Sequence, residues 1–469
     1  MKLWSISLRN LRVRLVATVL TMVSIVLATA LYAAILTMSE QTEARYKGSI
    51  GGFQAVVGPK DASQLEVVLN TIFNVDVAPG LFPLRICSEL RSGKSAGRRT
   101  QVRYAIPQAR GDSVSRFNFP VIGTIDEMFS RFEWQYDGEK REPLRFQAGE
   151  PFVYAYDELL QLADGLAAYE TGKRTEAPEP RPGRPLIQPQ WKKAVVGARV
   201  ARTLGLGLGG TITPVHGKFG EFGYHEHPEA TCEVVGILAP TNSPLDTTIF
   251  LPIGLHYLID GHEGGVFLVE TPPGKTPDDA KKLPVDAGRI GLTAIVVDPK
   301  DHFGARLLRQ EFSSKEAQVA WPADVIPKFL QQVGNAADAL AVIAWLVLLV
   351  AAISITVAIY NTMNERRREI AIMRSLGARR FQILAIIVGE AALLSCFGAL
   401  LGLVACHGAM FALQGVVEDA TGVYLEWAQF RAWEAWLLLG VTGLGAFAGL
   451  LPAIKGSMTQ VADNLAQNY

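Results

Sequence analysis

Apolar residues dominate four long runs of the chain, at residues 16–38, 339–360, 383–413 and 433–454. The first two runs carry no charged side chain, and each of the other two carries a single carboxylate. A helix rises about 1.5 Å per residue, so each run can cross the roughly 30 Å hydrocarbon core of a bilayer. The pattern predicts four transmembrane helices. A cleaved signal peptide is the less favoured interpretation of the first run, because such peptides have apolar stretches of only about 7–15 residues.

Residues 39–338, between the first two runs, have a mixed pattern that predicts a large α/β domain. Short segments rich in β-branched residues are typical of strands. They occur at residues 53–58, 100–107, 117–125, 232–240, 247–253 and 292–299. Helical periodicity occurs at 63–73 and 302–312, and residues 322–332 look like a helix that leads into the second apolar run. The expected fold class is therefore a four-helix membrane protein with an α/β domain between its first and second helices.

Composition agrees with a membrane protein. Charged residues make up 19% of the chain and apolar residues 49%, whereas soluble domains carry about 25% charged residues. The formal net charge is zero, which argues against a nucleic-acid-binding protein that relies on bulk electrostatics.

Basic residues predict the orientation of the four helices. Residues 1–15 carry four basic side chains and no acidic one, and the loop 361–382 carries six arginines. The loop 414–432 has three acidic residues and one arginine. Because Lys and Arg are retained on the cytoplasmic side, we expect segment 1–15, loop 361–382 and the tail 455–469 to be cytoplasmic. The domain 39–338 and the loop 414–432 then lie outside the cytoplasmic membrane.

The arginine-rich loop also contains apolar residues that topology does not explain. On a helical wheel Ile372, Met373 and Leu376 share an arc with Glu369, whereas Arg367 and Arg374 point the opposite way. Gly377 follows at the position of a left-handed C-terminal cap. The pattern predicts a short helix with an apolar face, whose partner is either lipid headgroups or a cytosolic protein.

Small residues recur at four-residue spacing in the third and fourth runs. Gly398 with Gly402, and Gly445 with Gly449, have the spacing that allows transmembrane helices to approach closely. Glu390 is the carboxylate of the third run. It is either a functional intramembrane group or a side chain that reaches the cytoplasmic interface.

Other motifs carry weaker chemical signals. The glycines of TLGLGLGGTI follow a helix-like segment and precede a strand-like one, which is the wrong order for a dinucleotide-binding loop. The sequence has no GxxxxGK[ST] motif and no recognisable catalytic constellation. We therefore expect no catalysis and no cofactor bound by this chain.

Two features of the outer domain concern metals and disulfides. His216, His225 and His227 lie in one glycine-rich segment and could bind a cation such as Zn²⁺, or they could belong to a solvated polar loop. A disulfide between Cys87 and Cys232 is possible if the domain is extracytoplasmic.

The segment NERRREIAIMRSLGARRFQI, with Glu390 and the GALLG that follows, resembles the signature of FtsX/MacB-type permeases of ABC transporters. LRNLRVRLVATVLTMVSI is similar to that family's entry into its first helix. AVVGARVARTLGLGLGGTI and EVVGILAPTNSPLDTTIFLP resemble the MacB-like outer core, and Pro452 with Ala453 matches the exit of the fourth helix. Two departures are that this chain has no fused ATPase and lacks the usual proline near Val461.

The resemblance implies a subunit that works with a cytosolic ABC ATPase and a second permease subunit, either identical or different. The loop helix would dock on the ATPase, so ATP would act through the partner. A periplasmic or outer-membrane partner would fit the same family. The expected coupling residues are Glu365, Arg368, Glu369, Ile372, Met373, Arg374, Leu376 and Gly377.

The favoured function is a permease subunit of a MacB-like ABC transporter in the cell inner membrane. It would export or extract a lipoprotein, peptide or hydrophobic compound by moving its outer domain. One alternative is an FtsX-like mechanotransmitter that activates envelope hydrolases. A second alternative is a membrane-anchored metal sensor that uses the three histidines.

Overall fold

The structure is a computed structural model of the chain. It describes residues 15–458 except 49–50, 76–77, 96–97, 100, 115–116, 137–139, 176–181, 217–223, 260–266, 269–275, 277–282, 313, 366 and 422–425. Residues 1–14 of the expected cytoplasmic segment and most of the tail 455–469 lie outside these residues. The chain divides into two compact units: residues 45–330 form one, and residues 1–44 with 331–469 form the other.

Over the residues that the structure describes, the helical unit contains four long helices and one short one. They are α2 (Leu15–Gly48), α11 (Pro322–Glu365), α12 (Arg367–Ser375), α13 (Arg380–Thr421) and α14 (Ala432–Ser457). The four long helices are long and apolar enough to cross a membrane, which confirms the predicted fold class. The segment 322–332 does belong to the same helix as the second apolar run, because α11 is continuous from Pro322.

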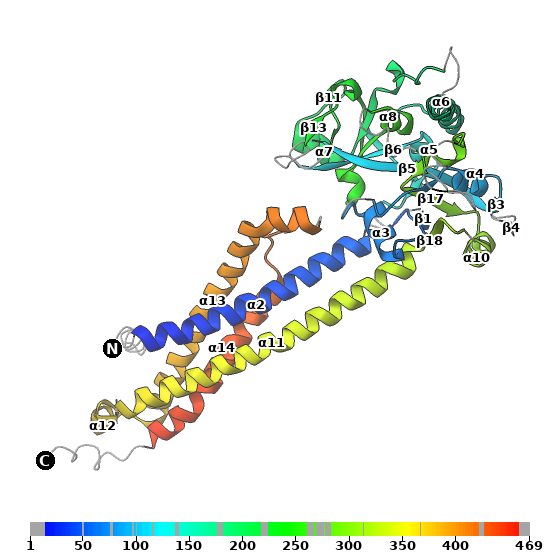
Figure 1. Ribbon diagram of the computed structural model, residues 1–469. Coiled ribbons are helices and arrows are strands. Elements are labelled where there is room, and N and C mark those ends of the chain that lie inside the picture. Colours follow the sequence, from blue (N-terminus) through cyan, green and yellow to red (C-terminus); the bar gives the residue numbers. More distant parts are fainter. Residues whose placement is uncertain are drawn as a thin grey trace. The chain divides into compact units, whose positions relative to one another are not determined.

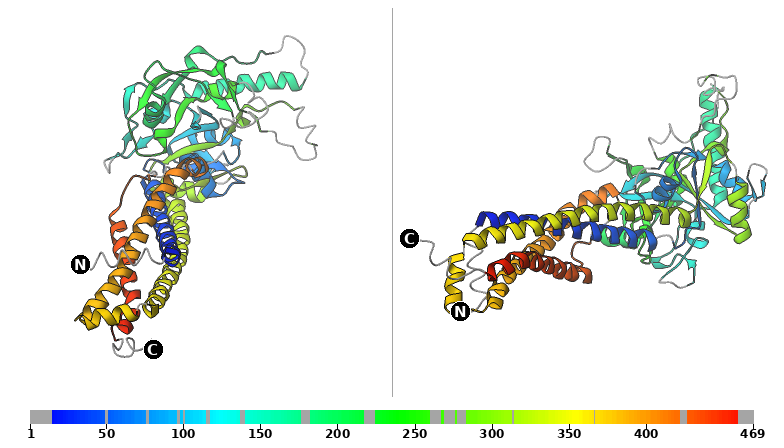
Figure 2. Two further views of the ribbon diagram at one scale, coloured as in Figure 1. Left: turned by 90° about the vertical axis from the view of Figure 1, so that its left-hand side faces the viewer. Right: turned by 90° about the horizontal axis from the view of Figure 1, so that it is seen from below.

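Side chains from all four long helices form one buried cluster in the helical unit. Its members are mostly small or aliphatic: Ile25, Ala28, Leu348, Ala351, Ala352, Ile355, Ala391, Leu394, Ala399, Val441 and Ala448. Helices α2 and α11 run side by side in Figures 1 and 2, and Tyr32 meets Trp345 edge to face with ring centroids 5.9 Å apart. Many large apolar residues on the outer faces of these helices are exposed, among them Leu27, Val350 and Phe447. A bilayer would cover such faces.

A large mixed sheet forms the centre of the other unit (Figure 1). Its main path runs in the order β11 (Thr211–Ile212), β14 (Cys232–Leu238), β10 (Lys193–Val196), β15 (Ile249–Pro252), β6 (Phe119–Thr124), β5 (Val102–Val114), β17 (Ala294–Pro299), β1 (Ala55–Pro59) and β18 (Ala317–Ala320). The pairs β10–β14 and β15–β6 are parallel, and the other neighbours on this path are antiparallel.

Three further strands join this sheet away from its main path: β9 (Phe146–Gly149), β12 (Val215–His216) and β13 (His225–Glu226). Three two-stranded ribbons pair β2 (Phe82–Pro83) with β16 (Gly291–Leu292), β3 (Lys94–Ser95) with β4 (Arg98–Arg99), and β7 (Glu133–Trp134) with β8 (Glu142–Pro143). Strands β1 and β17 are buried along their whole length, in agreement with their mostly apolar sequences, and the buried Asp298 of β17 pairs with Arg103 at 2.6 Å.

Helices accompany the sheet: α3 (Gln64–Ile72), α4 (Arg85–Arg91), α5 (Glu127–Ser130), α6 (Tyr156–Arg174), α7 (Ala198–Leu204), α8 (Ile253–Leu258) and α10 (His302–Glu311). Local sequence explains where two of them begin. Ser63 and Glu66 form a capping box at the start of α3, and Asp301 accepts a hydrogen bond from Gly304 N at the start of α10. Helix α7 ends at Gly205, with φ +64°, and β11 follows, so the glycines form the predicted turn into a strand.

Candidate functional site

The short helix α12 is closed at its C-terminal end by a glycine cap. Gly377 has φ +96°, a conformation that costs glycine little. Its N–H donates to the carbonyl oxygen of Arg374 at 3.1 Å, and the N–H of Ala378 donates to that of Met373 at 3.0 Å. These two bonds form a Schellman motif. The left-handed cap predicted at Gly377 is confirmed.

One face of α12 packs against the neighbouring helices. Ile370 is 4% exposed and joins a buried cluster with Met363 of α11, Ile383 and Ile387 of α13, and Ala453 of α14. Met373 is half-buried and packs against the same cluster. These contacts hold α12 on the helical unit.

The other face of α12 exposes apolar side chains. Ile372 is 43% exposed and Leu376 is 82% exposed, and residues four apart lie on the same side of a helix. Phe381, in the first turn of α13, is 75% exposed. Arg379 and Arg380 lie between Leu376 and Phe381 in the sequence and are also exposed. We call Ile372 and Leu376 the exposed pair. Apolar side chains of this kind beside basic residues are suited to contact with another molecule.

The structure thus divides the three apolar residues that the helical wheel grouped together. Met373 packs toward the helical unit, whereas Ile372 and Leu376 face away from its buried cluster. Arg374 is half-buried. The side chains of Glu365, Arg368 and Glu369 lie outside the described residues.

The paired glycines lie at close helix contacts. A methyl group at Gly398 would lie 2.8 Å from Cγ2 of Ile25 in α2, and one at Gly402 would lie 2.9 Å from the carbonyl oxygen of Val26. Gly445 and Gly449 of α14 face α13, where added methyl groups would meet Ser395 and Ala391. Glu390 is half-buried in α13, one residue before Ala391.

A polar cluster that the sequence analysis did not anticipate joins α2, α13, α14 and the loop before α14. Arg431 lies 2.9 Å from Oε2 of Glu40, and Trp433 Nε1 donates to the same oxygen at 3.2 Å. His407 Nε2 lies 3.2 Å from Oε2 of Glu434, a carboxylate that is only 6% exposed. The sequence offered little indication of this polar cluster, because its residues come from three distant segments and match no motif.

The C-terminal helices match a known family. The family described as "FtsX-like permease C-terminal" matches residues 341–460, which include most of α11 and all of α12 and α13. Residues 341–460 are therefore similar to FtsX-like permease C-terminal domains, and we call them the permease domain. This is the domain that the arginine-rich segment suggested.

A relative of the chain supports the same family. An uncharacterised ABC transporter permease of Methanocaldococcus jannaschii is 29% identical over 245 residues, which cover 50% of this chain and 54% of that protein. The chain therefore matches about half the length of this curated relative. With the permease domain and four candidate spans, the chain is an integral membrane protein.

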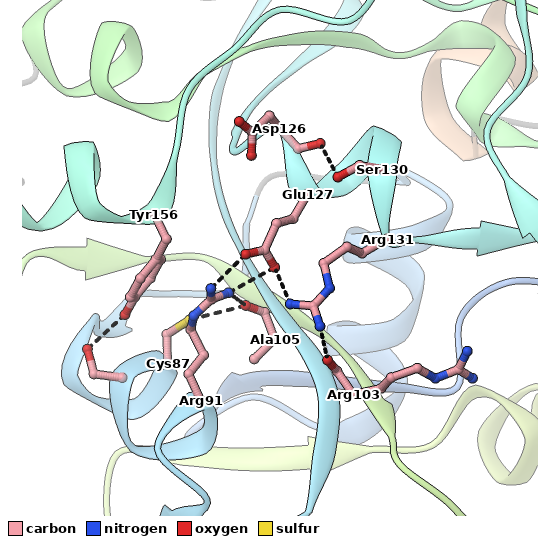
Figure 3. Close-up of polar contacts among 10 residues, drawn as sticks. Cys87, Arg91, Arg103, Ala105, Asp126, Glu127, Ser130, Arg131 and Tyr156 are labelled. Atoms are coloured by element: carbon pink, nitrogen blue, oxygen red, sulfur yellow. Dashed lines mark hydrogen bonds and ion pairs between the residues drawn. The ribbon is translucent and has the colours of Figure 1, made fainter.

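Outside the permease domain, the sheet unit contains a partly buried ion-pair network (Figure 3). Arg91 binds both carboxylate oxygens of Glu127, at 2.6 and 3.0 Å, and donates to the carbonyl oxygen of Ala105 at 3.0 Å. Its guanidinium lies over the ring of Tyr156, 4.1 Å from the centroid. Arg131 adds a second contact to Glu127 at 3.4 Å. The network ties α4, α5 and α6 to strand β5.

Cys87 lies beside this network and is a free, buried thiol, as is Cys232 in β14. Burial raises the pKa of each thiol to about 12, so both stay protonated at neutral pH and react slowly. The disulfide considered for this pair is absent.

The three histidines of the sheet unit come together. His216 and His225 are directly opposite each other on β12 and β13, and His227 follows two residues later. The three ring centroids are 4.5 to 5.2 Å apart. As the side chains are oriented, no group of three or more His, Cys, Asp or Glu among the described residues is arranged to hold a metal ion.

Proposed function

We propose that this chain is the permease subunit of an ABC transporter and that a separate cytosolic ATPase drives it through α12. The observation that carries the proposal is the exposed pair, Ile372 and Leu376, inside a domain that matches FtsX-like permeases. The relative that matches half of the chain is itself described as an ABC transporter permease.

The surface chemistry of α12 supports a protein partner rather than lipid headgroups. The exposed pair lies on a capped helix that is anchored by Ile370 and Met373, so it presents apolar side chains in a fixed position. A fixed apolar anchor suits a groove on a protein, where burying one aliphatic side chain contributes about 1.5–3 kcal/mol. The arginines around it would orient the helix against carboxylates at the rim of such a groove.

The orientation of the chain follows from the same assignment. A cytosolic ATPase can reach α12 only if the loop 361–382 is cytoplasmic, in agreement with its six arginines. Both termini would then be cytoplasmic, and the sheet unit would lie outside the cytoplasmic membrane. The resemblance of that unit to the MacB outer core favours export or extraction of a lipoprotein, peptide or hydrophobic compound by movement of the outer domain.

A second permease subunit, identical or different, is part of this proposal. The permease domain has long apolar helix faces that remain exposed, and lipid or a second subunit would cover them.

The test is a substitution at Leu376. Leu376→Asp places a charge where the ATPase groove would be apolar, which costs about 1–3 kcal/mol for a buried group left unsatisfied. We expect recovery of the ATPase with the tagged, detergent-purified chain to fall at least fivefold. The measurement is quantitative mass spectrometry of the co-purified proteins.

The control is Ser375→Asp, which adds the same charge at an exposed neighbouring position that points about 100° away around the helix. It should leave recovery near the wild-type value. Met373→Asp would not serve as a second test variant, because Met373 packs against the buried cluster and its replacement would also disturb the packing of α12. Undiminished recovery of the ATPase with Leu376→Asp would overturn the assignment of α12 to the ATPase.

A further inference from the structure

The ribbon formed by β12 and β13 places three histidines together. Its two strands are antiparallel, with Val215 opposite Glu226 and His216 opposite His225. Val215 also pairs with Ser113 of β5, and the N–H of His227 donates to the carbonyl oxygen of Pro214 at 3.0 Å. These backbone bonds fix the three Cα positions relative to the main sheet.

Strand geometry explains why the rings meet. Opposite residues of an antiparallel pair project from the same face, which brings His216 and His225 together, and His227 lies directly after β13. The ring centroids of His216 and His225 are 5.2 Å apart, those of His216 and His227 are 4.8 Å apart, and those of His225 and His227 are 4.5 Å apart. Each ring therefore contacts the other two.

This spacing agrees with the spacing around a metal ion. Three imidazoles that bind Zn²⁺ at about 2.0–2.1 Å in tetrahedral directions have ring centres on the order of 5 Å apart. The rings meet edge to face, at interplanar angles of 66° to 89°, so they are not stacked. Burial decreases from His227 through His216 to His225, which leaves one side of the group open to solvent.

A carboxylate contacts one of the rings, as carboxylates often contact histidines that bind a metal ion. Nδ1 of His227 lies 3.0 Å from Oε1 of Glu229. A carboxylate on one ring nitrogen fixes the tautomer and makes the other nitrogen the ligand. Glu229 would thus direct Nε2 of His227 toward an ion between the rings.

The present directions of the ring nitrogens do not surround a common point. The backbone together with the χ1 torsions fixes the ring positions, whereas rotation about χ2 changes mainly where the nitrogens point. The χ2 torsion of histidine has broad minima, so this rotation costs little compared with metal coordination. The centroid spacing is therefore the property that decides whether an ion fits.

We propose that His216, His225 and His227 form a binding site for a divalent cation of the Zn²⁺ class, with Glu229 as a supporting residue. Three neutral imidazoles suit Zn²⁺ and neighbouring transition metals rather than Ca²⁺ or Mg²⁺, which prefer oxygen ligands. Three protein ligands leave a fourth position for water or for a group from another molecule. The proposal rests on residues of the sheet unit alone and is independent of the ATPase assignment.

The test uses the full chain, purified in detergent with an affinity tag that contains no histidine. After removal of metal with a chelator, Zn²⁺ binding is measured by calorimetry, and Co²⁺ is added separately as a spectroscopic probe of tetrahedral coordination. We expect one Zn²⁺ per chain at micromolar concentration and a visible Co²⁺ spectrum typical of a tetrahedral site.

Variants decide which residues bind the ion. His225→Ala, at the exposed ligand, and His216→Ala should each weaken Zn²⁺ binding at least tenfold. Glu229→Gln should weaken it by about 10- to 100-fold. His302→Ala, an exposed histidine at the start of α10, is the matched control and should bind as the wild type does.

Two results would overturn the site. One is the absence of Zn²⁺ binding by the wild-type chain at micromolar concentration, and the other is wild-type affinity in either His225→Ala or His216→Ala. Both histidines lie nearer the surface than His227, so these variants should fold normally. Their urea-unfolding midpoints without metal, compared with that of the wild type, verify this.

Discussion

At the scale of single residues, Arg91 of the sheet unit depends on a counterion that is itself largely buried. Its side chain is 23% exposed and that of Glu127 is 16% exposed, so the pair is largely withdrawn from water. The guanidinium also contacts a carbonyl oxygen and an aromatic ring. Removing the Glu127 carboxylate would leave the Arg91 guanidinium partly desolvated and without its counterion. This destabilises a protein more than replacing both partners with apolar side chains does.

We predict that Glu127→Gln lowers the free energy of unfolding of the sheet unit by about 3 kcal/mol. The control is Glu170→Gln, which breaks a 3.8 Å pair with Lys173, a residue whose side chain is 51% exposed. That change should cost less than about 1 kcal/mol. Urea unfolding of the full chain in detergent, followed by tryptophan fluorescence, measures both. Equal midpoints for the two variants would contradict the role given to this pair.

The sequence predicted some residue roles and not others for a physical reason. Gly377 was predictable because a left-handed cap depends on local backbone chemistry. It was not predictable that Met373 would be packed and Leu376 exposed. A helical wheel gives the angles between residues but not which neighbouring helix covers each face. The pairs His407–Glu434 and Glu40–Arg431 were missed because they depend on how the helices pack.

At the scale of elements, contacts between helices in the helical unit depend on glycine. Gly402 allows α13 to approach the backbone of α2, since even one methyl group would lie 2.7 Å from Cβ of Thr29 and 2.9 Å from the Val26 carbonyl oxygen. Gly408 lies in the same helix six residues later, and a methyl group there would meet nothing within 4 Å.

We predict opposite effects for the same substitution at these two glycines. Gly402→Ala should destabilise the helical unit by about 1–3 kcal/mol, because it overpacks a contact with backbone atoms. Gly408→Ala should leave it unchanged or stabilise it by up to about 1 kcal/mol through helix propensity. Thermal unfolding of the purified chain in detergent compares the two. A Gly402→Ala variant as stable as Gly408→Ala would refute the close contact between α2 and α13.

Elements with strong local patterns were predicted, and those defined by pairing were not. The periodicity and caps of α3 and α10 place them close to their expected ranges. Strands β9 and β10 have only four residues each, too few for a reliable strand pattern, so they were missed. The parallel pairing of β10 with β14 joins residues about 40 positions apart, and no local signal specifies such a partner.

At the scale of the whole molecule, the distribution of arginine determines the expected topology. One loop of the permease domain contains six arginines, and the positive-inside rule predicts that such a loop is cytoplasmic. An arginine at the bilayer centre costs about 2.5–3.5 kcal/mol on insertion scales. The arginines therefore predict that the sheet unit lies on the opposite side of the membrane from α12.

We predict that Gly183→Cys is labelled by a membrane-impermeant maleimide in intact cells, whereas Met458→Cys is labelled only after permeabilisation. Both positions are exposed. The native thiols give little background, because burial keeps the pKa of Cys87 and Cys232 near 12 and the other two cysteines lie within the third span. Protection of Gly183→Cys in intact cells would reverse the topology and exclude a cytosolic partner for α12.

The connection between α12 and α13 has a mechanical consequence. Only four residues separate the two helices, and the glycine cap is followed by a second local bond, in which the N–H of Arg379 donates to Oε1 of Gln382 at 2.8 Å. These local bonds restrict the turn, so we expect α12 and α13 to move together rather than independently. The cluster around Ile370, Ile383 and Ala453 would serve as the fulcrum of this motion, so a pull on Leu376 would reach α13 as torque instead of being absorbed by the loop.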